Sequence, residues 1–153
     1  MNFIARLILF LIINFGALGI GIILMNDGPR TDWYLNLDKA PWTPPGWVFG
    51  FAWTTVMICF SIFMAKLTDT KINKVLILVF TFQFILNISW NYVFFNQHNI
   101  SLGMVNLIVL FALITMMTFT TRPKEKIYSI FILPYFTWLI VANSLNGYIL
   151  FMN

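Results

Sequence analysis

Long apolar stretches separated by short polar links make up almost the whole chain. A helix needs about 20 apolar residues to cross a bilayer, and five stretches reach that length: residues 3–25, 46–65, 72–95, 100–121 and 127–151. Backbone polar groups inside lipid are satisfied only in helices or closed barrels. The pattern therefore predicts an all-α membrane protein, a bundle of five transmembrane helices forming one domain over residues 1–153.

The polar links differ in length. Residues 26–45 form a long loop rich in Asp, Gly and Pro, whereas the later links are short, which makes successive helices antiparallel. The loop ends in the motif Trp42-Thr43-Pro44-Pro45-Gly46-Trp47. Thr43 suits an N-cap and Pro44 suits the first helical position. We expect a structured loop that closes over a cavity between the helices.

Composition and charge narrow the class of protein. The chain is 60% hydrophobic and 9% charged, against roughly 25% charged residues in soluble domains. The net charge is +4, but the positive residues are sparse along the chain, so no nucleic-acid partner is expected. Cys59 is the only cysteine, so an intramolecular disulfide is excluded. The first stretch is too long for a signal peptide and no cleavage motif follows it, so we expect a retained helix.

The basic residues predict the orientation. Seven of them fall on the side of the N-terminus and two on the other side: Arg6, Lys66, Lys71, Lys74, Arg122, Lys124 and Lys126 against Arg30 and Lys39. By the positive-inside rule the N-terminus is cytoplasmic, and the long loop and the C-terminus lie outside. A bacterial plasma membrane is the expected location.

The predicted spans carry amides and indoles in place of charges. No Asp or Glu lies inside them, and the single histidine, His98, falls in a turn, so no metal site is expected. Spacings of three and four residues place polar and aromatic side chains on common helix faces. These stripes are Phe49, Trp53 and Phe60; Gln83, Asn87, Trp90 and Asn91; and Trp138, Ala142, Leu145 and Asn146.

Each of these features also has a purely structural interpretation. Amides act as hydrogen-bonding glue between helices, and Trp42 and Trp47 suit interfacial anchors as well as ligand contacts. The glycines Gly16, Gly19 and Gly21 suit close helix packing. Pro134 is expected to kink the fifth helix beside Trp138. An uncharged cavity of rings and amides would suit a flat apolar ligand with a few polar groups.

These residues together resemble the translocator protein/tryptophan-rich sensory protein (TspO/MBR) family, the peripheral-type benzodiazepine receptors. The resemblance rests on segments 33–34, 39–50, 94–95 and 134–135, and on Trp53, Gln83, Leu86, Asn87, Trp90, Trp138, Ala142, Leu145 and Asn146. It implies a five-helix bundle, commonly a homodimer, with a porphyrin pocket under the first loop and no required cofactor. The implied pocket residues are Trp33, Tyr34, Trp53, Gln83, Asn87, Trp90, Trp138 and Ala142.

The resemblance leaves three functions open. The first is a receptor or transporter-like protein that binds porphyrins. The second is an enzyme that degrades protoporphyrin IX in light, in which Trp53 and Trp138 would be catalytic. The third is a regulatory scaffold in which the amides only hold helices together. Asn91 stands where many family members carry Ser, and no basic residue follows Tyr148 as a sterol-recognition pattern requires.

Overall fold

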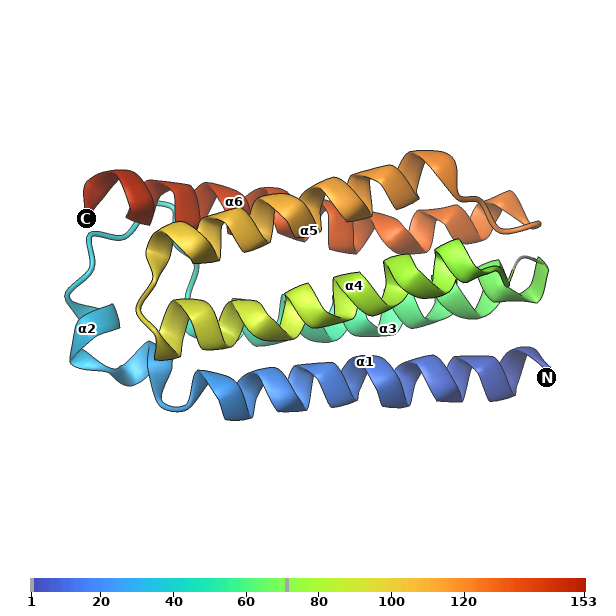
Figure 1. Cartoon of the computed structure of the whole chain (residues 1–153), viewed down its shortest axis with the longest axis horizontal. Helices are drawn as coiled ribbons and strands as arrows, with labels where there is room; N and C mark the ends of the chain where they lie inside the picture. The colour runs from blue at the N-terminus through green and yellow to red at the C-terminus, as the bar shows by residue number, and fades with distance from the viewer. Residues whose placement is uncertain (1, 71) are drawn as a thin grey trace.

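The computed structural model describes residues 2–70 and 72–153, and it is built from long helices (Figure 1). The long helices are α1 (Phe3–Met25), α3 (Gly46–Thr70), α4 (Lys74–Asn91), α5 (Ile100–Thr120) and α6 (Leu133–Met152). Within the described chain, five helical segments are long and apolar enough to cross a membrane. The predicted five-helix membrane fold is confirmed, and the first span has the predicted bounds.

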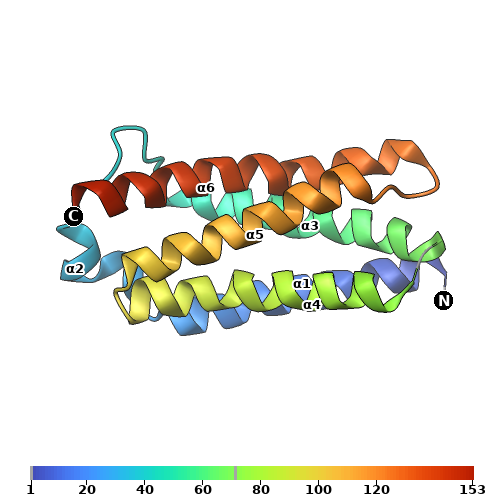
Figure 2. The same cartoon turned by 45° about the horizontal axis from the view of Figure 1, so that its top comes forward.

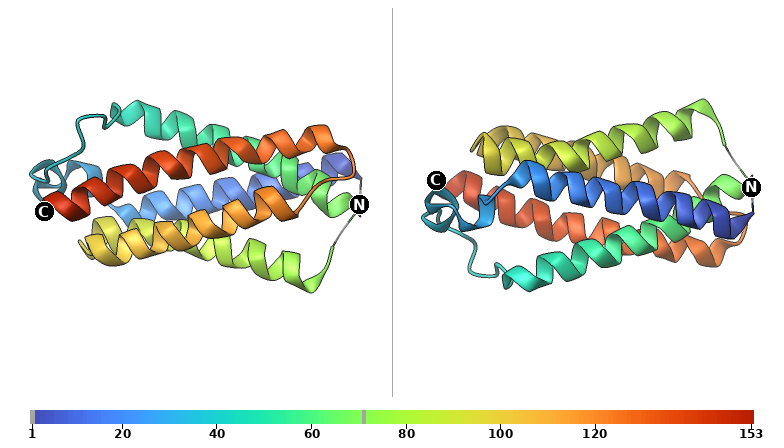
Figure 3. Two further views of the ribbon diagram at one scale, coloured as in Figure 1. Left: turned by 90° about the horizontal axis from the view of Figure 1, so that it is seen from above. Right: turned by 90° about the horizontal axis from the view of Figure 1, so that it is seen from below.

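The five helices form a closed ring around a shared interior. α1 packs on α3 and α4, α4 packs on α5, α5 packs on α6, and α6 packs on α3. The helices run along the long axis of the molecule with the two termini at opposite ends (Figure 2). Figure 3 shows the bundle from two opposite sides, with α6 in front of α1 in the left view and α1 in front in the right view. α4 and α6 are therefore not neighbours in the ring and face each other across its interior.

Asparagine caps start three of the long helices. The side-chain oxygens of Asn2, Asn73 and Asn99 accept hydrogen bonds from the backbone N–H three residues later, at 2.8 to 2.9 Å. Such caps satisfy donors that the first helical turn leaves free. This explains why α1, α4 and α5 begin where they do.

The start of α3 differs from the prediction. Thr43 is not an N-cap and Pro44 is not helical, because α3 begins at Gly46. The Thr43 hydroxyl and backbone N–H both donate to the carbonyl oxygen of Ala40, at 2.7 and 2.9 Å. Thr43 thus closes a turn within the loop. α3 also continues five residues beyond the predicted end, so Lys66 lies in a helix and not in a link.

The third and fifth spans each contain a stretch that is not α-helical. The third span ends in a π-helical turn, η2 (Tyr92–Asn96), and the fifth begins with a 3-10 segment, η3 (Lys126–Ile132). Pro134 lies in the first turn of α6, where its missing N–H leaves no acceptor unpaired. The predicted kink inside one continuous helix is wrong, because the change of winding precedes the proline.

Among the described residues, two ion pairs connect elements at the end of the bundle that carries the N-terminus. Arg6 of α1 pairs with Asp69 of α3, and the Lys66 ammonium lies 3.0 Å from a Glu125 carboxylate oxygen. Asp69 falls in the last turn of α3, beyond the predicted end of the second span, so this carboxylate lies at a helix end and not at membrane depth. Lys71 lies outside the described residues.

The apolar interior has two clusters. The larger fills the half of the bundle near the ion pairs and includes Phe60, Phe63 and Leu139. The smaller consists of Phe94, Phe95 and Ile149, and the loop residues Trp33 and Tyr34 pack against it. Trp90 packs against both clusters, so the region around it joins the two halves of the interior.

Candidate functional site

A hydrogen-bond network crosses the interior from α4 to α6. The Asn87 carboxamide donates to the Tyr135 hydroxyl at 2.8 Å, and that hydroxyl donates to Gln83 Oε1 at 3.1 Å. Tyr135 is 1% exposed, and both amides are buried. Amides in an apolar interior need such partners. The network fixes the amide stripe predicted on α4 against the opposite wall of the bundle.

Aromatic rings from α3 and α6 meet beside this network. The Trp53 ring lies edge-on to Trp138 at 6.5 Å and to Tyr135 at 6.1 Å between centroids. Phe49 meets Trp138 edge-on at 5.5 Å, and Phe60 meets Tyr135 at 5.2 Å. Edge-to-face pairs are the preferred aromatic geometry. The aromatic stripe predicted on the second span therefore faces the tryptophan of the fifth.

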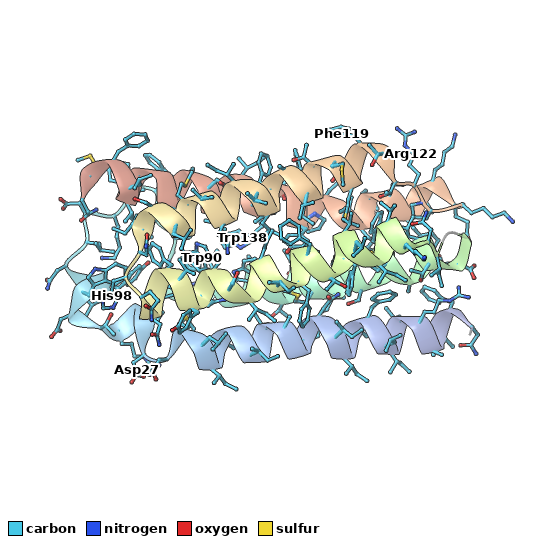
Figure 4. All side chains as sticks on the ribbon, in the orientation of Figure 1. Asp27, Trp90, His98, Phe119, Arg122 and Trp138 are labelled. Carbon is cyan, nitrogen blue, oxygen red and sulfur yellow. The ribbon has the colours of Figure 1, made fainter. Side chains whose placement is uncertain are left out.

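Trp90 lies on the opposite wall, on α4. Its ring stacks on Phe94 at 5.0 Å between centroids and meets Phe95 edge-on. Trp90 and Trp138 both point into the space between α4 and the α5–α6 pair (Figure 4). Their indole Nε1 atoms are buried, and neither has a hydrogen-bond partner among the described residues. Two unused donors therefore face the interior.

On α6, Leu145 and Asn146 are buried and Ala142 is half-buried. The Asn146 amide nitrogen lies 3.4 Å from the carbonyl oxygen of Ile100 and 3.6 Å from Met104 Sδ, both on α5. Its Oδ1 is buried without a partner among the described residues. On the side of α6 below loop 1, Asn146 Oδ1 is therefore a hydrogen-bond acceptor without a donor among the described residues.

Asn91 lies apart from these residues. A Cβ at Gly21 of α1 would lie 2.7 Å from Asn91 Nδ2, and Asn91 Nδ2 lies 3.4 Å from the carbonyl oxygen of Asn87. The structure therefore places Asn91 against α1. Of the three glycines expected to pack closely, only Gly21 does so, because Gly16 and Gly19 have open space where a Cβ would lie.

Loop 1, residues 26–45, covers the end of this region. Its elements are η1 (Gly28–Arg30) and α2 (Asp32–Leu35). The Trp33 ring stacks on His98 at 4.2 Å between centroids, and Tyr34 meets Phe95 at 5.3 Å. Burial raises the pKa of the Tyr34 phenol above its ordinary value. Trp33 and Tyr34 are placed over the smaller apolar cluster.

The second half of loop 1 is tied to α6. Trp42 Nε1 donates to the Ser144 hydroxyl at 3.2 Å, and the Trp42 ring meets Tyr148 edge-on. The Asn153 side chain accepts from the Asp38 N–H at 2.9 Å and donates to the Asp38 carbonyl at 3.2 Å. Pro44, Pro45 and Gly46 lead from this tie into α3. Trp47, in contrast, is 72% exposed on the outer surface.

The hollows on the surface of the described chain include the following two. One of about 470 Å³ lies at the loop 1 end and is lined by residues 97–101, Leu150 and Asn153. The other, of about 380 Å³, lies along the outer side of α4. Neither is lined by Trp53, Trp90 or Trp138. Among the described residues, no three His, Cys, Asp or Glu side chains converge as metal ligands would.

Comparison with known proteins decides the family. The model of the TspO/MBR family matches residues 8–152. The chain belongs to the TspO/MBR family.

Relatives within the family cover most of this chain. It is 31% identical over 143 residues to the tryptophan-rich protein TspO of Chlorobaculum tepidum, covering 90% of this chain and 89% of that one. It is 30% identical to protein CrtK of Rhodobacter capsulatus over 74% of each chain. It is 26% identical to the human translocator protein, over 78% of this chain and 73% of that one. As a TspO/MBR member with these spans, it is an integral membrane protein.

One central residue of the site, Tyr135, was not predicted from the sequence. Tyr135 is the hub of the amide network, yet the expected pocket did not include it. Its position three residues before Trp138, on the same helix face, was an available signal. The partners that give it this role lie 48 and 52 residues earlier in the chain. The TspO/MBR site therefore joins rings, amides and a buried hydroxyl without a charged group.

Proposed function

We propose that this TspO/MBR protein is a membrane receptor or transporter-like protein that binds a porphyrin between α3, α4 and α6, beneath loop 1. The observation that carries this is the pair of buried, unpartnered indole N–H groups of Trp90 and Trp138. They lie among aromatic rings that suit a flat ring system. The TspO/MBR membership and the resemblance of the pocket residues support the same ligand.

The ligand-binding residues of this proposal come from four parts of the chain. Trp33 and Tyr34 in loop 1 form the cover, with the Trp42–Gly46 motif as its tie to α3 and α6. Phe49 and Trp53 form one wall. Gln83, Asn87 and Trp90 belong to the opposite wall, and the α6 side consists of Trp138, Ala142, Leu145 and Asn146. Asn91, expected from the sequence to bind the ligand, is left out because it lies against α1 at Gly21. In the closed arrangement the rings pack together, so ligand entry requires them to part.

An equilibrium titration tests the proposal. Protoporphyrin IX is added in the dark to the detergent-purified protein while tryptophan fluorescence is recorded. We expect saturable quenching, with Kd rising at least about tenfold in the double variant Trp53→Phe/Trp138→Phe, equivalent to about 1.4 kcal/mol. Trp47→Phe is the matched control, since Trp47 lies on the outer surface. Linear quenching that is equal in all three proteins would contradict the proposal.

A second candidate function is light-dependent porphyrin degradation. The observation that favours it is the edge-on contact of Trp53 and Trp138, two oxidisable indoles 6.5 Å apart between centroids. In this scheme the excited porphyrin, with dioxygen as oxidant, would react beside those rings. The test follows the Soret band of the bound complex under illumination. Equal bleaching rates in the wild type and in the Trp53→Phe/Trp138→Phe variant would remove both tryptophans from any catalytic role.

The third possibility, a regulatory scaffold, requires no ligand in the interior. It is supported by the amide network, which has a structural role regardless of ligand. It predicts that no porphyrin binds saturably and that Asn87→Ala only destabilises the fold. The same titration decides between the scaffold and the receptor.

We also propose the orientation and the assembly. By the positive-inside rule, the cations at the N-terminal end favour a cytoplasmic position of that end in a bacterial plasma membrane, with loop 1 outside. A homodimer is expected, and the open outer face of α1 at Gly16 and Gly19 would allow a second copy to approach closely. Accessibility of cysteines introduced at residues 30 and 124 tests the orientation. Light scattering in detergent tests the homodimer.

A further inference from the structure

The end of the bundle that carries the N-terminus has a surplus of positive charge. Its described charged side chains are six cations and two carboxylates: Arg6, Lys66, Lys74, Arg122, Lys124 and Lys126, with Asp69 and Glu125. Both carboxylates are already used, because Asp69 pairs with Arg6 and Glu125 pairs with Lys66. The other four cations therefore have no ion-pair partner within the part of the chain that the structure describes.

These four cations form what we call the basic face. Lys74 begins α4, whereas Arg122, Lys124 and Lys126 lie between the end of α5 and the first residue of η3. All four side chains are exposed. Lys124 is near enough to Asp69 for an electrostatic interaction, but that carboxylate is already paired. The basic face is therefore available to an anion from outside the chain.

Exposed apolar side chains lie directly beside these cations. Phe119, in the last turn of α5, is three residues before Arg122, and Figure 4 shows both on the outer side of the bundle. On α4, Val75 and Leu78 follow Lys74 within one turn. The three apolar side chains are 66 to 68% exposed, and they belong to spans long enough to cross a membrane. They therefore contact lipid tails, and the cations lie at the level of the headgroups.

Loop 1, at the opposite end of the bundle, has no such surplus. Its two cations, Arg30 and Lys39, are outnumbered by the carboxylates of Asp27, Asp32 and Asp38. The Lys39 ammonium also donates to two backbone carbonyl oxygens of the loop. An anion is therefore attracted to one end of the bundle and not to the other.

We propose that the basic face binds anionic phospholipids, with the phosphate group beside the cations and an acyl chain along Phe119 or along Val75 and Leu78. Clusters of four or more Lys and Arg just beyond membrane-spanning helices attract anionic lipids. A soluble phosphate would gain only the electrostatic attraction, whereas a lipid also buries apolar surface against the neighbouring side chains. The inference does not depend on any ligand in the interior of the bundle.

Native mass spectrometry tests the proposal, because it counts the lipid molecules retained by each protein molecule. The full-length protein in detergent micelles is titrated at low and high salt with phosphatidylglycerol or with phosphatidylcholine of the same acyl chains. We expect the first phosphatidylglycerol to bind at least roughly fivefold more tightly at low salt. Salt screens exposed charges, so this advantage should shrink at high salt.

Two matched variants locate the effect. The triple variant Arg122→Gln/Lys124→Gln/Lys126→Gln removes three charges of the basic face, so it should bind the two lipids with similar affinity. The variant Arg122→Lys/Lys124→Arg/Lys126→Arg alters the same positions and keeps the charges, so it should behave like the wild type. Arg30→Gln, at the opposite end, should leave the preference for phosphatidylglycerol unchanged.

Three results would overturn the proposal. The first is equal or absent binding of the two lipids to the wild type. The second is a preference for phosphatidylglycerol that survives in the triple glutamine variant, which would exclude the basic face as its source. The third is displacement of the lipid by an equal concentration of inorganic phosphate, which would show a site for free anions in place of a lipid site.

Discussion

The Tyr135 hydroxyl of α6 accepts a hydrogen bond from the Asn87 carboxamide of α4 at 2.8 Å, between two helices that are not neighbours in the ring. The same hydroxyl donates to Gln83 one turn earlier on α4. One phenol thus satisfies two amides inside the bundle. It connects opposite walls at the level where Trp53 and Phe60 also meet its ring.

Tyr135→Phe should therefore destabilise the fold more than loss of a single surface hydroxyl would. The change leaves the Asn87 donor and the Gln83 acceptor unpaired in an apolar interior. We expect a loss of about 1–3 kcal/mol in the free energy of unfolding, measured by denaturant titration in mixed micelles. Tyr148→Phe is the matched control, since Tyr148 is half-buried and its one aromatic contact among the described residues is with Trp42. Equal losses in the two variants would show that the network contributes nothing.

Gly28→Ala should loosen loop 1. A Cβ at Gly28 would lie 2.6 Å from three atoms of the Phe95 side chain, which is itself buried. No side chain tolerates that approach, so we expect η1 to lift from η2. Hydrogen exchange of the backbone amides in residues 26–45 should become faster. Gly46→Ala, which meets nothing within 4 Å, should leave the exchange unchanged, and the same rates in both variants would refute this packing.

Gly21→Ala should strain the contact between α1 and α4. The added Cβ would lie 2.7 Å from Asn91 Nδ2, and overpacking of this kind costs about 1–3 kcal/mol. We expect a lower thermal midpoint in detergent, with Gly19→Ala unaffected because its surroundings are open. Asn91→Ser shortens the opposing side chain, so it should restore the midpoint of Gly21→Ala. A double variant as unstable as the single one would exclude Asn91 as the source of the strain.

Asn153→Ala should release the second half of loop 1 from α6. The Asn153 carboxamide makes two hydrogen bonds to the Asp38 backbone, each worth about 0.5–1.5 kcal/mol. Exchange of the Asp38 amide should become roughly tenfold faster or more. Phe151→Ala is the control, as this ring is exposed and outside the contact. Unchanged exchange at Asp38 in Asn153→Ala would mean that Trp42 alone holds the loop.

The sequence predicted those parts of the fold that depend on local composition. The bounds of α1 follow from an apolar stretch interrupted only by Arg6 and Asn14, and the orientation of the stripes on α3 and α4 follows from helical periodicity. Prediction from the local sequence failed where one side chain can make either of two hydrogen bonds. Thr43 can cap a helix, but here its hydroxyl is used by the Ala40 carbonyl, so the turn prevails and α3 starts later.

The remaining differences concern contacts between distant parts of the chain. Periodicity puts Asn91 on the polar stripe of α4, but only the packing of α1 shows that it faces Gly21. Likewise, the role of Tyr135 depends on two amides on another helix. Pro134 was expected to bend a helix, because the sequence does not show that the residues before it adopt 3-10 winding.

The position of the porphyrin is tested most directly by the indole N–H signals of the six tryptophans. Proton–nitrogen NMR spectra of the labelled protein in micelles are recorded in the dark, with and without protoporphyrin IX. The signals of Trp90 and Trp138, whose N–H groups are buried and unpartnered, should shift saturably, whereas that of the exposed Trp47 should not. A shift confined to Trp42 and Trp47, with Trp90 and Trp138 unmoved at saturation, would contradict a porphyrin site in the interior.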